Sequence, residues 1–234
     1  MENKKVIYPG YFQENVRADA FRGDFDCKNQ VLIENNVAVD YVFFGDSITQ
    51  MWELNAYFRG ETGCIVNRGI GGDRTKYGAK RFEADALQFS PKCCIFMMGI
   101  NDAWDLEFDH WKQLPGMSLQ TIKEAATQNI LQIITMAKAK GIALALCSIL
   151  PTDMLFTNQE QVRKEYAVQL NIEIERLCKE HNCIYVDYHS ALVDTDGLTV
   201  KAGLTIEGLH PNVFGYNIMA NILRTRLATH GFTI

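Results

Sequence analysis

Short apolar runs alternate with longer amphipathic segments over most of the chain. Each run has the length and the aliphatic or aromatic content of a buried β-strand. The segments between the later runs repeat apolar residues at intervals of three and four, as helices do. Strands that alternate with helices form a parallel sheet. The five predicted strands are 41–44, 64–66, 93–98, 142–149 and 183–186.

The same periodicity predicts helices at 118–140, at about 159–180 and at about 213–227. The residues before the first strand, 1–38, are expected to form a helical lead-in that packs on the core. The apolar positions of this lead-in are Phe12, Val16, Phe21, Phe25 and Val31. The sequence shows no internal repeat, low-complexity tract or linker rich in Pro, Gly or Ser, so we predict a single domain over 1–234.

Polar residues follow three of the predicted strands directly. Ser47 comes after the first strand, a glycine-rich turn at 67–73 ends the second, and Asn101 follows the third. Ligands bind at the carboxyl ends of the strands in such sheets, where the strand order reverses. We predict a three-layer α/β/α fold with a flavodoxin-like order of 2-1-3-4-5. In that order, Ser47 lies between the turn that contains Gly72 and Asn101.

A fourth polar segment, 205–212, precedes the last predicted helix. It contains Glu207 and, three residues later, His210. At that spacing in a turn, a carboxylate can orient an imidazole. A serine, a histidine and an acid together point to nucleophilic acyl chemistry.

The four segments together resemble a known family. Gly-Asp-Ser-Ile at 45–48, Asn-x-Gly-x-Gly-Gly-Asp at 67–73, Gly-x-Asn-Asp at 99–102 and acid-x-x-His-Pro-Asn at 207–212 resemble the four blocks of the SGNH hydrolases, also called GDSL esterases/lipases. The second block is most similar to the branch that contains platelet-activating-factor acetylhydrolase subunits and bacterial carbohydrate esterases. The resemblance implies the SGNH hydrolase fold and an esterase activity.

The resemblance also assigns roles. Ser47 corresponds to the nucleophile, and its backbone N–H to one oxyanion donor. Gly72 and Asn101 match the other two donors, through a backbone N–H and a side-chain amide, and His210 matches the general base. These roles agree with the chemistry, because a serine hydroxyl needs a neighbouring base and a tetrahedral oxyanion needs preorganised donors.

One position departs from the family pattern. The acid three residues before the histidine is usually Asp, and here it is Glu207. Glutamate is longer by one methylene, so the turn or the rotamer must adjust for it to hold the imidazole. We expect Glu207 to be the orienting acid. The alternatives are a backbone carbonyl, Asp194 or Asp196.

Other interpretations compete with these assignments. A serine after a strand is often only a helix N-cap, and Asp46 is expected to be a structural hydrogen-bonding residue of the turn. The glycines at 69–72 resemble a dinucleotide fingerprint, but Arg74 replaces its third glycine, so that interpretation is rejected. His189 is the rival base, and we expect it to be structural.

Composition excludes several classes of protein. The net charge of −5 argues against a surface for nucleic acid. No apolar run approaches a membrane span or the core of a signal peptide, so we expect a cytoplasmic protein, although a chain trimmed of a signal would look the same. The seven cysteines are expected to be reduced. Cysteine and histidine are common metal ligands, but we do not expect Cys178, His181 and Cys183 to form a metal site. We expect neither a metal nor a cofactor.

The substrate is less well determined. The loop after Asn101 contains Trp104 and Trp111, which we expect either to form a wall or lid of the site or to cap the core. Trp52 and Asp73 are further candidate lining residues. Acidic residues in the same loop favour a short acyl ester, an acetyl ester above all, of a carbohydrate or similar polar alcohol. The alternatives are a lysophospholipase or thioesterase activity, or a catalytically silent binding protein. A homodimer is an open option.

Overall fold

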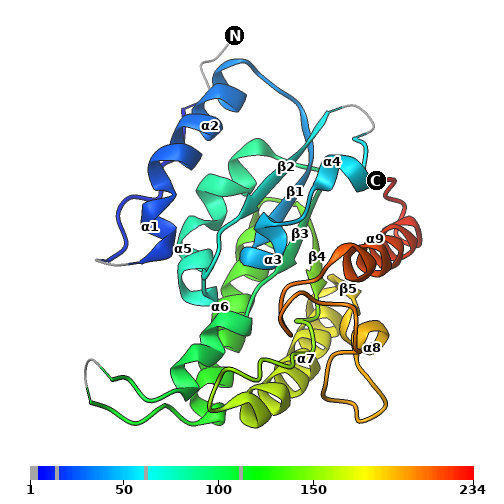
Figure 1. The fold of residues 1–234 in the computed structure, drawn as a ribbon. Helices are drawn as coiled ribbons and strands as arrows, with labels where there is room; N and C mark the ends of the chain where they lie inside the picture. Colours follow the sequence, from blue (N-terminus) through cyan, green and yellow to red (C-terminus); the bar gives the residue numbers. More distant parts are fainter. Residues whose placement is uncertain (1–4, 14–15, 61–62, 111–112) are drawn as a thin grey trace.

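The computed structural model describes residues 5–13, 16–60, 63–110 and 113–234. Within these ranges, five parallel strands form one sheet in the order β2-β1-β3-β4-β5, with helices on both sides (Figure 1). The predicted three-layer fold and its strand order are therefore confirmed. All five predicted strands are present, with slightly different ends. They are β1 Val39–Gly45, β2 Cys64–Gly69, β3 Cys93–Met97, β4 Ala143–Cys147 and β5 Ile184–Val186.

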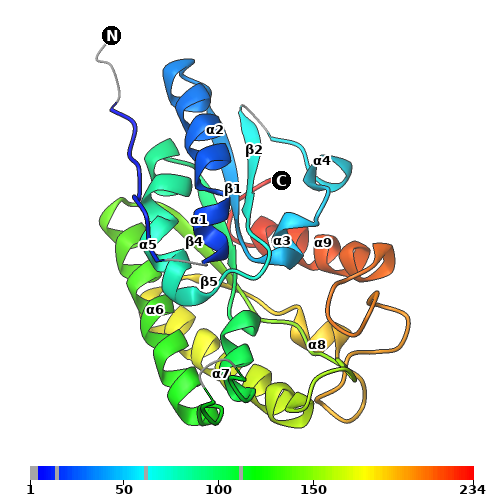
Figure 2. The same ribbon diagram turned by 60° about the vertical axis from the view of Figure 1, so that its left-hand side comes forward.

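Three helices, α5, α6 and α7, pack in a row on one side of the sheet, whereas α9 lies on the other side with the short α3 and α4 (Figure 1). Figure 2 shows α1 and α2 beside α5 and β2. The helical elements are α1 Arg17–Ala20, α2 Arg22–Glu34, α3 Ser47–Gln50, α4 Leu54–Tyr57, α5 Thr75–Asp85, η1 Leu87–Phe89, η2 Ile100–Leu106, α6 Leu119–Ala139, α7 Glu160–His181, α8 His189–Leu192 and α9 Val213–Ala228.

The three predicted helices are present as α6, α7 and α9. The expected lead-in is also helical, and Phe25 is buried in it as predicted. Val31 is not, because it lies on the outer face of α2 and is 53% exposed. None of the helices in the described ranges is long and apolar enough to cross a membrane. The single domain and the cytoplasmic location stay predictions.

Strand β1 lies at the centre of the sheet, and every residue from Val39 to Gly45 is buried. Its last residue, Gly45, is in register with Gly69 on β2 and with Met97 on β3. The segments that follow these three strands therefore start at the same edge of the sheet. A side chain at Gly45 would overlap the hydroxyl of Thr49, so β1 can turn into α3 at this point only with glycine.

A buried ionic network joins these strand ends to the helices on their flank. The guanidinium of Arg81, from α5, has no exposed surface. Its Nη2 donates to the carbonyl of Gly45 and its Nη1 to the carbonyl of Arg68, each at 3.0 Å. Its Nε lies 2.7 Å from Asp73, and its Nη1 lies 3.1 Å from Asp85. One side chain thus links the end of β1, the end of β2 and the turn after β2.

The second carboxylate of this network is shared with the lead-in. Arg22, on α2, forms two hydrogen bonds of 2.8 Å with Asp85, and Asn29 donates to the same carboxylate at 2.8 Å. These bonds lower the pKa of Asp85 despite its burial. The lead-in is therefore attached to α5 by paired charges as well as by apolar contacts.

We expect Arg81→Met to lower the free energy of unfolding by about 3–5 kcal/mol, because the buried carboxylate of Asp73 loses its charged partner and that of Asp85 loses one of two. Urea denaturation followed by circular dichroism measures this. Arg176→Met is the control, since Arg176 pairs with Glu173 and Glu180 on the exposed surface of α7; its effect should stay below about 1 kcal/mol. Equal effects of the two substitutions would contradict the importance of the buried network.

Candidate active site

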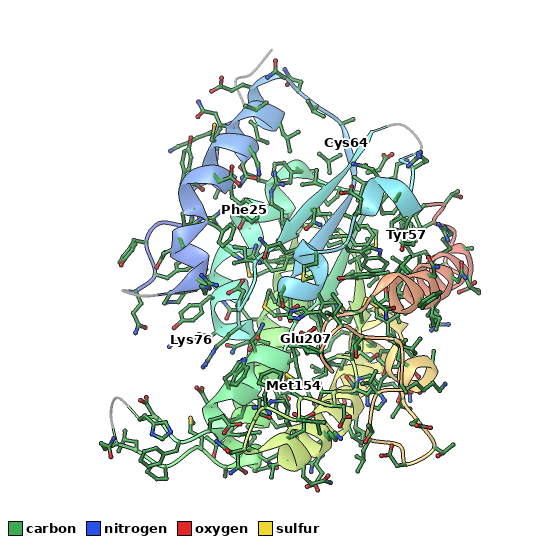
Figure 3. All side chains as sticks on the ribbon, in the orientation of Figure 1. Phe25, Tyr57, Cys64, Lys76, Met154 and Glu207 are labelled. Atoms are coloured by element: carbon green, nitrogen blue, oxygen red, sulfur yellow. The ribbon has the colours of Figure 1, made fainter. Side chains whose placement is uncertain are left out.

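Ser47 and His210 meet at the carboxyl edge of the sheet. The Oγ of Ser47, the first residue of α3, lies 2.9 Å from Nε2 of His210. The other ring nitrogen of His210, Nδ1, contacts Oε1 of Glu207. Figure 3 shows Glu207 close below α3, on the loop that leads to α9. The three side chains form a continuous series of contacts from a hydroxyl to a carboxylate, although 163 residues separate Ser47 from His210.

The turn that carries Glu207 and His210 is closed on itself. The N–H of Ile206 donates to the carbonyl of His210 at 2.8 Å, and Thr205 forms a bridge with Pro211. Within this turn, Glu207 reaches the imidazole that lies three residues later. The longer acid is thus accommodated without Asp194 or Asp196, whose carboxylates accept hydrogen bonds from backbone groups of their own turn.

Asp46 fixes the position of Ser47. Its carboxylate accepts a 3.0 Å hydrogen bond from the N–H of Ile48 and caps α3, which agrees with the structural role expected for it. Tyr216, on α9, donates to the carbonyl of Ile48 at 2.8 Å, and its ring stacks on Trp52. The nucleophile turn is therefore held by its own aspartate and by a side chain from α9.

Three N–H groups near Ser47 are available to an oxygen atom. Among the described residues, the backbone N–H groups of Ser47 and Gly72 donate to no protein acceptor. The amide of Asn101 donates one hydrogen to the carbonyl of Asp73 at 3.1 Å and keeps the other. The N–H of Gly71, by contrast, donates to the side-chain oxygen of Gln50 at 2.6 Å. The groups that remain are the three that the sequence predicts as oxyanion donors.

Gly72 has a φ of +76°, in the left-handed region that favours glycine. A Cβ at this position would lie 3.3 Å from Cγ of Arg17, on α1. The lead-in thus places a cationic side chain against the glycine-rich turn. Sequence reasoning missed Arg17, because a single arginine far from the four motif segments gives no signal.

Buried carboxyl groups lie under the site. Burial raises the pKa of Asp46 from 3.8 to about 7, and hydrogen bonding to Ile48 opposes this only in part. Burial also raises the pKa of Asp102 to about 6, although Thr75 donates to it from both its N–H and its hydroxyl. Removal of these carboxyl groups from water is the dominant cause in each case.

Two of the expected lining residues lie in the interior instead. Trp52 is 3% exposed, because its ring packs among aromatic side chains of the core. Asp73 is buried and paired with Arg81. Trp104 is partly exposed and lies 4.9 Å above the guanidinium of Arg163. Trp111 lies outside the described residues.

Two acidic residues of the loop after Asn101 are already paired. Asp105 forms a 2.6 Å ion pair with Arg74, and Glu107 lies 3.0 Å from the buried Arg163. These carboxylates stabilise the loop and are not free to bind a polar substrate. That part of the argument for a carbohydrate substrate therefore loses its support.

The remaining candidates have structural positions. His189, the rival base, is buried at the start of α8 and makes no contact with Ser47. Burial lowers its pKa. The residues that the structure describes include no cluster of His, Cys, Asp and Glu suited to a metal ion.

Comparison with known proteins gives a consistent result. The profile of the GDSL-like lipase/acylhydrolase family matches residues 43–218, which include all four motif segments. An acetylxylan esterase of Geobacillus stearothermophilus is 28% identical over 159 residues, which are 67% of this chain and 68% of the esterase.

Solved structures share the fold. A GDSL-like lipase of Bacteroides thetaiotaomicron superposes with a TM-score of 0.74 at 22% identity, over 89% of this chain and 97% of the lipase. A candidate platelet activating factor from Streptococcus pneumonia gives a TM-score of 0.69 at 24% identity, over 88% and 92% of the two chains.

The raised pKa of Asp46 predicts a pH-dependent stability. Between pH 4 and 7 the folded protein binds a proton at Asp46 that the unfolded chain releases, so the contribution of this group to stability falls as the pH rises. Asp46→Asn keeps the acceptor oxygen for Ile48 but cannot ionise. We expect the stability of the variant relative to the parent to increase from pH 4 to 7 in urea denaturation. A difference in stability between variant and parent that stays constant from pH 4 to 7 would contradict the prediction.

Proposed function

Since this chain belongs to the GDSL-like lipase/acylhydrolase family and is a carboxylic ester hydrolase, we propose that it cleaves short acyl esters, acetyl esters above all, of a carbohydrate or similar polar alcohol. The single observation that carries the proposal is the Ser47–His210–Glu207 series of contacts beside three available N–H groups. This arrangement supplies a nucleophile, a base and an oxyanion site together.

In the proposed first step, Oγ of Ser47 attacks the ester carbonyl carbon while its proton passes to Nε2 of His210. Glu207 keeps its contact with Nδ1 and stabilises the imidazolium that forms. The carbonyl oxygen becomes an oxyanion and accepts hydrogen bonds from Ser47, Gly72 and Asn101. Each such donor lowers the barrier by roughly 3–4 kcal/mol.

When this tetrahedral intermediate collapses, the bond between the carbonyl carbon and the alcohol oxygen breaks. His210 gives its proton to the departing alkoxide, which leaves as the alcohol, and an acyl group stays on Ser47. Water then attacks this acyl-enzyme and gives a proton to His210. The bond between the acyl carbon and Oγ of Ser47 breaks, His210 returns the proton to Oγ, and the carboxylic acid leaves. Every proton passes through Nε2 of His210, which the structure places 2.9 Å from Ser47.

The preference for acetyl esters rests on the sequence similarity to the acetylxylan esterase. Three catalytic mutants of that enzyme carry alanine in place of a serine, an aspartate and a histidine. This aspartate lies three positions before the histidine. Glu207 and His210 have the same spacing in this chain. This match supports the assignment of Glu207 as the orienting acid.

We expect Ser47→Ala to reduce the hydrolysis of p-nitrophenyl acetate by at least about 10³-fold, because the acyl-enzyme cannot form. Ser190→Ala is the matched control, since Ser190 is a serine whose hydroxyl bonds Asp187 at the surface. Mass spectrometry after treatment with a fluorophosphonate should show one adduct, at Ser47. A fully active Ser47→Ala protein would contradict the mechanism, and a protein with neither turnover nor adduct would favour a silent binding protein.

We expect Glu207→Gln to lower kcat by about 10²–10⁴-fold, because a neutral amide cannot stabilise the imidazolium. Glu207→Asp tests whether a shorter carboxylate still reaches the imidazole of His210. Because aspartate is the usual family residue, this variant should retain more activity than Glu207→Gln. Asp194→Asn and Asp196→Asn are the controls, because these carboxylates only bond their own turn. Full activity of Glu207→Gln would show that another group orients His210.

A further inference from the structure

A cavity of about 550 Å³ lies next to Glu207 and is not used in the mechanism above. One wall comes from the loop between β4 and α7, and the other from the loop between α8 and α9. Three of its lining side chains are large, apolar and exposed: Leu155 at 85%, Phe156 at 67% and Ile206 at 65%. Exposed apolar side chains gathered around one cavity are typical of a binding site.

The two walls are fixed relative to each other. The N–H of Asp153 donates to the carbonyl of Gly208 at 2.7 Å, and a side chain at Gly208 would overlap the backbone of Asp153. Lys164 holds the carboxylate of Asp153 at 2.7 Å, while Met154 is buried. In Figure 3, Met154 and Glu207 mark the place where the two loops meet. Leu155 and Phe156 therefore follow directly after a segment that is anchored to both walls.

The chemistry of the site determines which part of an ester reaches this cavity. The carbonyl oxygen must face the N–H groups of Gly72 and Asn101. The alcohol oxygen must instead face Nε2 of His210, because it takes a proton from there. The turn that carries His210 also forms the cavity wall, through Thr205, Ile206, Glu207 and Gly208, so the alcohol is the part of the ester on the side of the cavity.

We propose that this cavity binds the alcohol part of the ester and selects alcohols that present an apolar face of about the size of a six-membered ring. This inference rests on the proposed function and specifies the alcohol that the site takes. Phe156, Leu155 and Ile206 form the apolar surface on which such a ring lies. The C–H face of a pyranose and the face of a cycloalkyl ring share this property, and a volume of 550 Å³ holds either one.

The test compares esters that share an acyl group. The substrates are methyl acetate, cyclohexyl acetate and a mono-acetylated methyl glycopyranoside, and the measured quantity is kcat/KM for each ring ester divided by kcat/KM for methyl acetate. In Leu155→Ala/Phe156→Ala we expect this ratio to fall about tenfold for at least one ring ester, mainly through a higher KM. The ring ester whose ratio falls more shows whether the natural alcohol is a sugar or an apolar alcohol.

Two controls accompany the test. Ile172→Ala removes an apolar side chain of similar exposure from α7, outside the cavity, and should leave the ratios unchanged. A second series, methyl acetate against methyl butyrate, varies the acyl group instead. If the double variant changes the acyl series and not the alcohol series, the cavity binds the acyl chain and the inference is wrong.

The inference and the proposed function fail in different ways. Unchanged ratios in a double variant that still hydrolyses methyl acetate overturn the alcohol site alone. No hydrolysis of any acetate by the parent protein overturns the proposed function. Because both substituted side chains are largely exposed, the double variant should unfold at the same urea concentration as the parent.

Discussion

The guanidinium of Arg81 is the interaction on which the geometry of the active site depends. It is fully buried, and its N–H groups bond the carbonyls of Gly45 and Arg68 and the carboxylates of Asp73 and Asp85. Ser47 follows Gly45 by two residues, and Gly72 directly precedes Asp73. The nucleophile and the oxyanion glycine are thus attached to one planar cation, which adds to the direct bonds from Ile70 to Gly45 and from Gly71 to Gln50 that join the two turns.

The sheet could be predicted because its pattern is local. Continuous apolar runs and helices with three- and four-residue periodicity gave the five strands, α6, α7 and α9. Helix α5 escaped prediction because its inner face contains Arg81 and Asp85 together with apolar residues. A helix that buries paired charges lacks the apolar periodicity by which helices are recognised. Val31 was misplaced for the opposite reason, since an apolar side chain is free to lie on an outer face.

The candidate site could be predicted as a set of residue types but not as a shape. The four motif segments indicated Ser47, Gly72, Asn101 and His210, and strand order explains why the first three converge. Whether Glu207 reaches the imidazole depends on how its turn closes, and whether Trp52 faces solvent depends on the aromatic side chains around it. These are tertiary properties. The position of Arg17 depends on how the lead-in packs, which no local pattern encodes.

The separation of 163 residues between Ser47 and His210 has a consequence for how activity arises during folding. The nucleophile turn lies near the start of the chain, and the base lies just before the last helix. A contact between such distant positions carries the entropic cost of closing the long loop between them, which the rest of the fold must offset. A partly folded chain can contain the central strand and its serine without a base beside it. Chemical reactivity at Ser47 therefore requires that the loop before α9 has docked beside the central strand.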